Sequence, residues 1–216
     1  MTSPNHNDRP AGRAIDMLLL HYTGMATADA ALARLCDEAA EVSAHYLIDE
    51  GGEVIALVGE DRRAWHAGVA CWAGERDING CSIGIELVNP GHEFGYRAFP
   101  QAQMDALSTL CREILGRYPI PPHRVLGHSD VAPARKEDPG ELFDWAALAA
   151  VGISLWPEAC EANPALVLAD LGYDVAGAGL AACATAFQRH WRPAKIDGVM
   201  DRECQGMLAG LLDQIV

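Results

Sequence analysis

Positive charge is scarce in this sequence, and the scarcity excludes one class of partner. The 216 residues include 16 Lys and Arg but 30 Asp and Glu, which gives a formal net charge of −14. Proteins that bind nucleic acid need clustered cationic side chains to neutralise phosphates. We therefore expect no nucleic-acid partner.

Long apolar runs are missing as well. No segment approaches the roughly 18 consecutive apolar residues of a membrane-spanning helix. Early in the chain the only apolar run is 17–20, shorter than the roughly 7–15 residues in the apolar part of a secretory signal. We expect no membrane span, a flexible N-terminus over 1–13 and a cytoplasmic protein. A leader missing from this chain would instead place it in the periplasm or at the outer membrane.

The seven cysteines form no Cys-x-x-Cys pair, the spacing typical of many structural zinc sites and redox motifs. Cys36, Cys111 and Cys183 lie in helix-like segments, where a small apolar residue suits the pattern. An odd number of buried, reduced thiols is typical of a reducing compartment, which also favours the cytoplasm.

Segments with strand patterns alternate with segments of helical period up to about residue 157. Strands are expected at 15–22, 43–49, 53–58, 82–88 and 125–128, and helices at 27–40 and 101–118. This alternation predicts an α/β domain over 14–157, with a mixed central β-sheet flanked by helices. Residues 62–81 show no period but carry Trp, Gly, His and Asn, so we expect a long functional loop there.

Beyond residue 157 the pattern becomes helical. Asn163 and Pro164 suit a cap followed by proline in the first turn, and Gly172 suits a helix end. Two further segments of helical period follow, so we predict a small three-helix domain over 158–216. The sequence does not give the oligomeric state.

Two histidines lie at the ends of predicted strands. His21 follows the apolar run 17–20, and His128 follows 125–127. In open α/β sheets, sites are built at strand ends and in the loops beyond them. Two histidines and one carboxylate, with a fourth position open, form a common catalytic zinc set. The sequence thus predicts a Zn²⁺ site with His21 and His128, although either histidine alone also fits a hydrogen-bonded rim residue.

The loop after His128 offers two candidates for the carboxylate ligand. In an extended segment Lys136 and Asp138 project to the same side, so one would supply a cation and the other the ligand. Asp130 is the rival ligand, and its other possible role is a loop cap or a hydrogen-bond acceptor behind the ligands. The distance in sequence from His128 does not decide between Asp130 and Asp138.

Glu86 is the candidate general base. It alternates with Ile83, Ile85 and Leu87, so it points away from the apolar face of its strand. A carboxylate beside a metal-activated water suits proton transfer. The alternative is an ordinary surface glutamate on a strand.

Several segments resemble one family. They are 21–23 (HYT), 42–48 (VSAHYLI), 63–68 (RAWHAG), 82–87 (SIGIEL) and 127–140 (GHSDVAPARKEDPG). Together they are similar to the N-acetylmuramoyl-L-alanine amidases related to peptidoglycan recognition proteins and phage amidase-lysozymes, and within these to the AmpD/AmiD type. The resemblance covers about 14–157. It implies zinc bound by His21, His128 and Asp138, with Glu86 as the catalytic glutamate and Lys136 assisting the transition state.

The resemblance also implies the substrate and the fold. The fold expected is that of the peptidoglycan recognition proteins, and the bond cleaved joins N-acetylmuramic or anhydromuramic acid to the L-alanine of the stem peptide. Peptidoglycan fragments or anhydro-muropeptides would be the partners. Segments 171–173 (LGY), 186–189 (AFQR) and 197–201 (DGVMD) resemble an appended peptidoglycan-binding domain. A helical accessory that only packs on the amidase is the alternative for 158–216.

Five residues are candidate substrate contacts: His45, Trp65, His66, Arg76 and Asn79. The planar guanidinium of Arg76 suits a stem-peptide carboxylate, although a solvated surface charge explains it equally. His45 also fits a structural role. A non-catalytic module that binds muropeptides is the alternative function, and a zinc peptidase acting on other bonds of the stem is a third. The complete metal set together with Glu86 favours the amidase.

Overall fold

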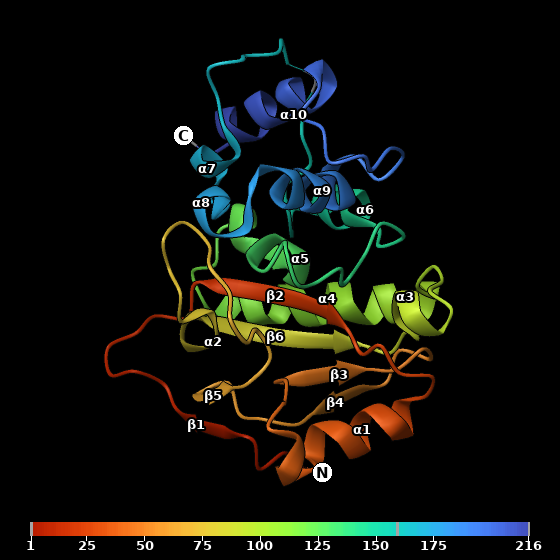
Figure 1. Cartoon of the computed structure of the whole chain (residues 1–216). Helices are drawn as coiled ribbons and strands as arrows, with labels where there is room; N and C mark the ends of the chain where they lie inside the picture. The colour runs from red at the N-terminus through yellow and green to blue at the C-terminus, as the bar shows by residue number, and fades with distance from the viewer. Residues whose placement is uncertain (1, 159, 216) are drawn as a thin grey trace.

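A five-stranded mixed sheet forms the centre of the protein, in the order β4-β3-β6-β2-β7 (Figure 1). The computed structural model describes residues 2–158 and 160–215. The strands of this sheet are β2 (Met17–Tyr22), β3 (Tyr46–Ile48), β4 (Val54–Ala56), β6 (Ser82–Leu87) and β7 (Val125–Gly127). All five overlap predicted strands, and the mixed sheet with flanking helices confirms the predicted fold class.

The central strands run parallel. β2 lies between β6 and β7 and pairs with both in the parallel sense, and β3 pairs with β6 likewise. In this sheet only β4 is antiparallel, and it pairs with β3. Because parallel strands end at the same edge, residues that follow β6, β2 and β7 lie close together there.

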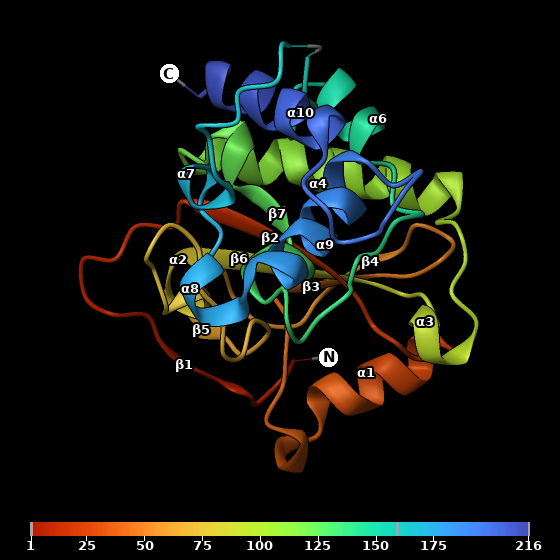
Figure 2. The same cartoon turned by 45° about the horizontal axis from the view of Figure 1, so that its top comes forward.

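Each face of the sheet has its own apolar layer. Leu18 and Leu20 pack on one face, which is covered by α4 (Gln101–Arg117). Met17 and Leu19 alternate with them and pack on the other face, beneath the C-terminal helices (Figures 1 and 2). This period of two explains why β2 is a near-continuous apolar run, since both of its faces are buried.

Helix α4 matches the predicted helix closely and is amphipathic. Its buried residues include Met104, Leu107, Cys111 and Ile114, at helical spacing. Among the residues that the structure describes, no helix combines the length and the apolar character required to cross a membrane.

Short helices lie between the strands and just beyond the last strand, β7. They are α1 (Ala28–Cys36), α2 (Ile78–Cys81), α3 (Gly91–Phe94), α5 (His128–Val131) and α6 (Trp145–Ala150), with 3₁₀ turns at Glu38–Ala40 and Pro122–Arg124. Thr27 caps α1, because its side chain accepts a hydrogen bond from the Ala30 amide at 3.2 Å. The expected loop over 62–81 contains α2 at its end, and the loop after His128 begins with α5.

Within the described residues, four helices follow residue 160 where three were predicted. They are α7 (Leu168–Leu171), α8 (Val175–Ala178), α9 (Leu180–Trp191) and α10 (Arg202–Asp213). Phe187 and Trp191 of α9 share one apolar cluster with Met17, Leu19 and residues of α10. The C-terminal helices therefore pack directly on the sheet, and a separate domain over 158–216 stays a prediction.

The N-terminal segment differs from the predicted flexible leader. Strand β1 (His6–Asp8) pairs antiparallel with β5 (Arg62–Ala64). Ser3 is buried and donates a hydrogen bond to the Leu35 carbonyl. Arg9 donates to the carbonyl oxygens of Glu60, Asn79, Gly80 and Ser82. These partners lie far along the chain, so the sequence pattern near residue 10 contains no sign of them.

We expect Phe187→Ala to destabilise the sheet as well as α9. Phe187 is fully buried in the shared cluster, and removing a buried phenyl ring costs about 3–5 kcal/mol. Urea denaturation followed by both circular dichroism and tryptophan fluorescence should show one transition at a lower midpoint. Leu180→Ala, on the same helix but 57% exposed, is the control and should change the midpoint little. Two separate transitions would contradict a shared core.

Candidate active site

Three neighbouring strands deliver the candidate chemical groups to one edge of the sheet. His21 lies opposite Glu86 in the β2–β6 register, and Leu20 lies opposite Gly127, the residue before His128. Both His21 and Glu86 point away from the face that packs on α4, since their neighbours Leu20 and Ile85 belong to that layer. Backbone pairing alone thus brings three distant parts of the chain together.

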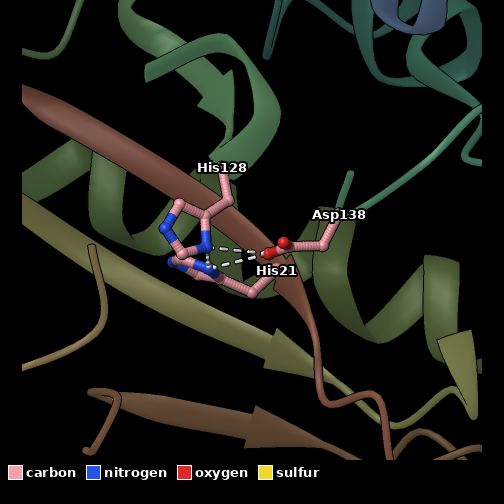
Figure 3. A group of neighbouring side chains, drawn as sticks. All are labelled: His21, His128 and Asp138. Atoms are coloured by element: carbon pink, nitrogen blue, oxygen red, sulfur yellow. Dashed lines mark hydrogen bonds and ion pairs between the residues drawn. The ribbon is translucent and has the colours of Figure 1, made fainter. Parts of the chain in front are cut away.

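His21, His128 and Asp138 form a compact buried cluster (Figure 3). The Nδ1 atoms of the two histidines are 2.9 Å apart. Asp138 Oδ2 lies 3.1 Å from His21 Nδ1 and 3.0 Å from His128 Nδ1. Three potential ligand atoms therefore converge on one point, while Asp130 lies outside the cluster.

This cluster fits a tetrahedral metal ion. Ligand atoms at about 2.0–2.1 Å from a tetrahedral zinc lie about 3.3–3.4 Å from one another, so the three atoms are only slightly closer than such a site requires. Burial lowers the pKa of His21 to about 4, with His128 adding to the shift. A neutral imidazole and an ionised carboxylate are the forms that bind metal.

The hydrogen bonds of His128 fix the ring in the form that a metal needs. Its Nε2 lies 3.0 Å from the carbonyl oxygen of Ala67, which can only accept. Nε2 must therefore carry the proton and donate, which leaves the lone pair on Nδ1 facing the cluster.

The loop that carries Asp138 is held against α5. The Ser129 amide donates to the Asp138 carbonyl at 2.9 Å. Gly127 allows a close approach there, because a Cβ atom at this position would lie 2.7 Å from Pro139 Cδ. These contacts bring Asp138 back to the ring of His128, ten residues earlier.

Glu86 and Lys136 line the cleft next to the cluster. The cleft has a volume of about 430 Å³ and also contains His128 and Asp138 in its wall. Glu86 Oε2 is buried and has no hydrogen-bond partner among the described residues. Burial, followed by the charge of Asp138, raises the pKa of Glu86 well above its usual range. A carboxylate in this state takes up a proton readily, as a general base requires.

Asp130 instead joins α5 to the C-terminal helices. Its carboxylate accepts hydrogen bonds from the Gly127 amide at 2.8 Å, from Tyr173 Oη at 2.6 Å and from His190 Nδ1 at 2.8 Å. His190 is stacked between Trp145 and Trp191, with ring centroids 3.7 Å from each. The fully buried Asp130 thus supports the segment that begins at His128.

The five predicted substrate contacts do not share one location. Trp65 and His66 line the cleft, whereas Arg76 lines a second pocket. The Nη2 atom of Arg76 lies 3.3 Å from Asp174 Oδ2. His45 and Asn79 are buried, and they line neither the cleft nor the second pocket. Asn79 Oδ1 accepts hydrogen bonds from the amides of His66 and Ala67.

Some residues of the cleft were not singled out from the sequence. Arg34 of α1, His92 of α3 and Arg135 also line it. Arg135 is adjacent to Lys136 in the chain, which is the one sequence signal that could have suggested it. Arg34 lies on a helix whose pattern shows only its packed face, so the cleft around it emerges only from the tertiary fold.

Comparison with known proteins identifies the family. A family model described as N-acetylmuramoyl-L-alanine amidase matches residues 11–141. The chain belongs to this family. The match confirms the predicted enzyme class, an amidase acting on the bond between muramic acid and L-alanine.

Two curated relatives support the assignment. The amidase AmiD of Escherichia coli is 37% identical over 93% of this chain and 83% of its own length. The 1,6-anhydro-N-acetylmuramyl-L-alanine amidase AmpD of Enterobacter cloacae is 36% identical over 66% of this chain and 83% of its own length.

Solved structures extend the similarity to the C-terminal helices. AmiD of Escherichia coli in complex with anhydro-N-acetylmuramic acid-L-Ala-D-γ-Glu-L-Lys has a TM-score of 0.83, at 34% identity over 95% of this chain and 92% of the other. AmpDh3 of Pseudomonas aeruginosa, in complex with an anhydromuramic pentapeptide, has a TM-score of 0.85 at 34% identity, over 95% and 94%.

We expect Tyr173→Phe to lower stability, because it removes the hydroxyl that donates to buried Asp130. A buried acceptor left without its partner costs about 1–3 kcal/mol. The free energy of unfolding from urea titration should fall by this amount, with the fold retained. An unchanged value would show that Asp130 does not depend on this contact.

Proposed function

We propose that this amidase depends on zinc and that His21, His128 and Asp138 hold the ion. The convergence of their three ligand atoms beside Glu86 is the observation that carries the proposal. The bond cleaved joins N-acetylmuramic or anhydromuramic acid to the L-alanine of a stem peptide. When bound, zinc supplies a Lewis acid and lowers the pKa of a water molecule towards about 7.

Glu86 acts as the general base and then as the general acid. Its Oε2 is buried, has no hydrogen-bond partner among the described residues, and faces the cleft. It accepts a proton from the attacking water and later delivers that proton to the amine of L-alanine as the bond breaks. A raised pKa favours the first of these transfers.

Lys136 stabilises the negative charge that develops on the carbonyl oxygen. It lines the same cleft as Glu86 and Asp138, and it is half-buried. A fixed cation beside a developing oxyanion lowers the barrier more in a water-poor cleft than in bulk water. Glu86 and Lys136 therefore divide proton transfer and charge stabilisation between them.

Peptidoglycan fragments are the proposed partners. Two similar structures, at TM-scores of 0.83 and 0.85, contain anhydromuramic acid linked to a peptide, and the cleft here has a volume of about 430 Å³. Trp65 at the cleft wall offers an apolar surface on which a sugar ring can pack. The seven cysteines, all free, favour a reducing compartment such as the cytoplasm, where soluble anhydro-muropeptides would be the substrate.

Residues 158–216 are proposed to form the C-terminal helical domain of the peptidoglycan-binding type. Such a domain could direct the enzyme to polymeric peptidoglycan. The test compares the cleavage rate of the full chain on soluble anhydro-muropeptide with its rate on insoluble sacculi. Faster cleavage of sacculi would contradict both the cytoplasmic assignment and soluble anhydro-muropeptides as the substrate.

Mass spectrometry of muropeptides incubated with the protein tests the reaction. An amidase releases an intact stem peptide and a free muramic acid. Unchanged muropeptides would support the non-catalytic binding module, and a shortened stem would support a peptidase.

We expect Lys136→Ala to lose about 10²–10³-fold in kcat, the typical cost of removing one group that stabilises an oxyanion. Zinc content should stay at the wild-type level, because Lys136 is not among the three ligands. Metal analysis and steady-state kinetics on a muropeptide measure the two quantities. Full activity in this variant would remove Lys136 from the mechanism.

We expect Asp138→Ala to lose zinc. Asp138 supplies one of only three protein ligand atoms, and its oxygen contacts both histidine nitrogens. Glu137→Ala is the matched control, since the adjacent Glu137 is exposed and pairs with Arg189 instead. After dialysis, metal analysis should find zinc in Glu137→Ala but not in Asp138→Ala. The reverse result would refute the assignment of Asp138 as a ligand.

A further inference from the structure

We propose that His66 is a positioning residue that fixes the proton on Nε2 of His21, so that Nδ1 of His21 presents its lone pair to the metal. The inference rests on the proposed zinc site and adds a residue to it. It also assigns His66 a role different from the substrate contact expected from the sequence.

The direction of the hydrogen bonds is set at Ser82. Its hydroxyl lies 2.6 Å from the carbonyl oxygen of Ile78, which can only accept. The single hydroxyl proton of Ser82 is therefore used in this bond. His66 Nε2 lies 3.3 Å from the same Ser82 oxygen, so His66 must be the donor in that contact.

The proton on His66 also sets the direction of the hydrogen bond between His66 and His21. A neutral imidazole carries one proton, and the His66 ring is buried beside the rings of His21 and His45. With its proton on Nε2, His66 has a lone pair on Nδ1, which lies 3.1 Å from His21 Nε2. His21 therefore donates from Nε2, and its Nδ1 carries the lone pair that faces His128 and Asp138.

The ring of His66 has little freedom to turn. A Cβ atom at Gly84 would lie 2.5 Å from the His66 ring, so the ring lies against the backbone of β6. The His66 amide is held by Asn79 Oδ1 at 3.1 Å, and that oxygen also accepts from the Ala67 amide at 2.8 Å. Glycine is thus required where the ring packs, and the backbone on either side of the ring is fixed.

One short segment orients both histidine ligands. The side chain of His66 fixes the ring of His21, and the carbonyl of Ala67 fixes the ring of His128 at 3.0 Å. Asn79 holds both residues by their amides. The segment 66–67 therefore supports both histidines through their Nε2 atoms, the ring nitrogens that do not contact Asp138.

Zinc affinity of three variants of the full chain tests the proposal. His66→Ala removes the acceptor for His21 Nε2, and Ser82→Ala removes the group that sets the direction. Loss of a partner behind a metal ligand typically weakens binding about 10–100-fold, measured here as Kd by chelator competition. His66→Asn places a carbonyl oxygen close to the former Nδ1 position, and it should recover most of the affinity. Equal affinity in wild type and His66→Ala, or no recovery in His66→Asn, would overturn the proposal.

Nitrogen NMR of the histidine rings gives a readout independent of metal and activity. In the zinc-free wild-type protein, His21 should be protonated on Nε2, and in Ser82→Ala a second tautomer should appear. Protonation of His21 on Nδ1 in the wild type would overturn the proposal even if His66→Ala fails to fold. Wild-type protein that binds no zinc would instead refute the proposed function, so the two failures are distinguishable.

Discussion

The parallel pairing of β2 with β6 and β7 is the constraint on which the site depends. It places His21 opposite Glu86 and brings the residue before His128 opposite Leu20. Because side chains alternate along a strand, a slip of one residue would move His21 into the layer beneath α4 and expose Leu20 at the site. The four apolar residues of β2 fit either register, so the slip is opposed mainly by the cost of burying the polar ring of His21 in the apolar layer beneath α4. The packing of the core and the position of the metal ligands are therefore set by the same register.

The polar groups behind the ligands show how a buried site keeps its geometry. Asp130 is fully buried and accepts hydrogen bonds from one backbone amide, from Tyr173 between α7 and α8, and from His190 of α9. Ala67 and His66 contact the two histidines of the cluster. In a low-dielectric interior each such group needs a partner, and a satisfied network holds a single arrangement. The C-terminal helices are thus connected to the site through Asp130, although none of their residues belongs to the metal cluster.

The sequence predicted the groups that lie on strands better than those that depend on loops. His21, Glu86 and His128 could be found because an apolar strand pattern ends or alternates at each. The choice between Asp130 and Asp138 could not be made by spacing, because both follow the same strand. It depends on a backbone bond from Ser129 to Asp138 and on Tyr173, 43 residues beyond Asp130. The pairing of β1 with β5 and the role of His66 likewise rest on contacts between distant residues, which no local pattern records.

The free energy of the metal site is also part of the free energy of folding. The fold buries an ionised Asp138 between two histidines and leaves Glu86 Oε2 without a partner among the described residues. Burying an ionised carboxylate costs several kcal/mol, even after relaxation. A divalent cation at the proposed site would offset this cost only in the folded chain, because the three ligand atoms are far apart in the unfolded one. Affinity for the cation and stability of the fold would therefore be linked, and the contacts of His66 and Ala67 behind the two histidines keep the three ligand atoms in place.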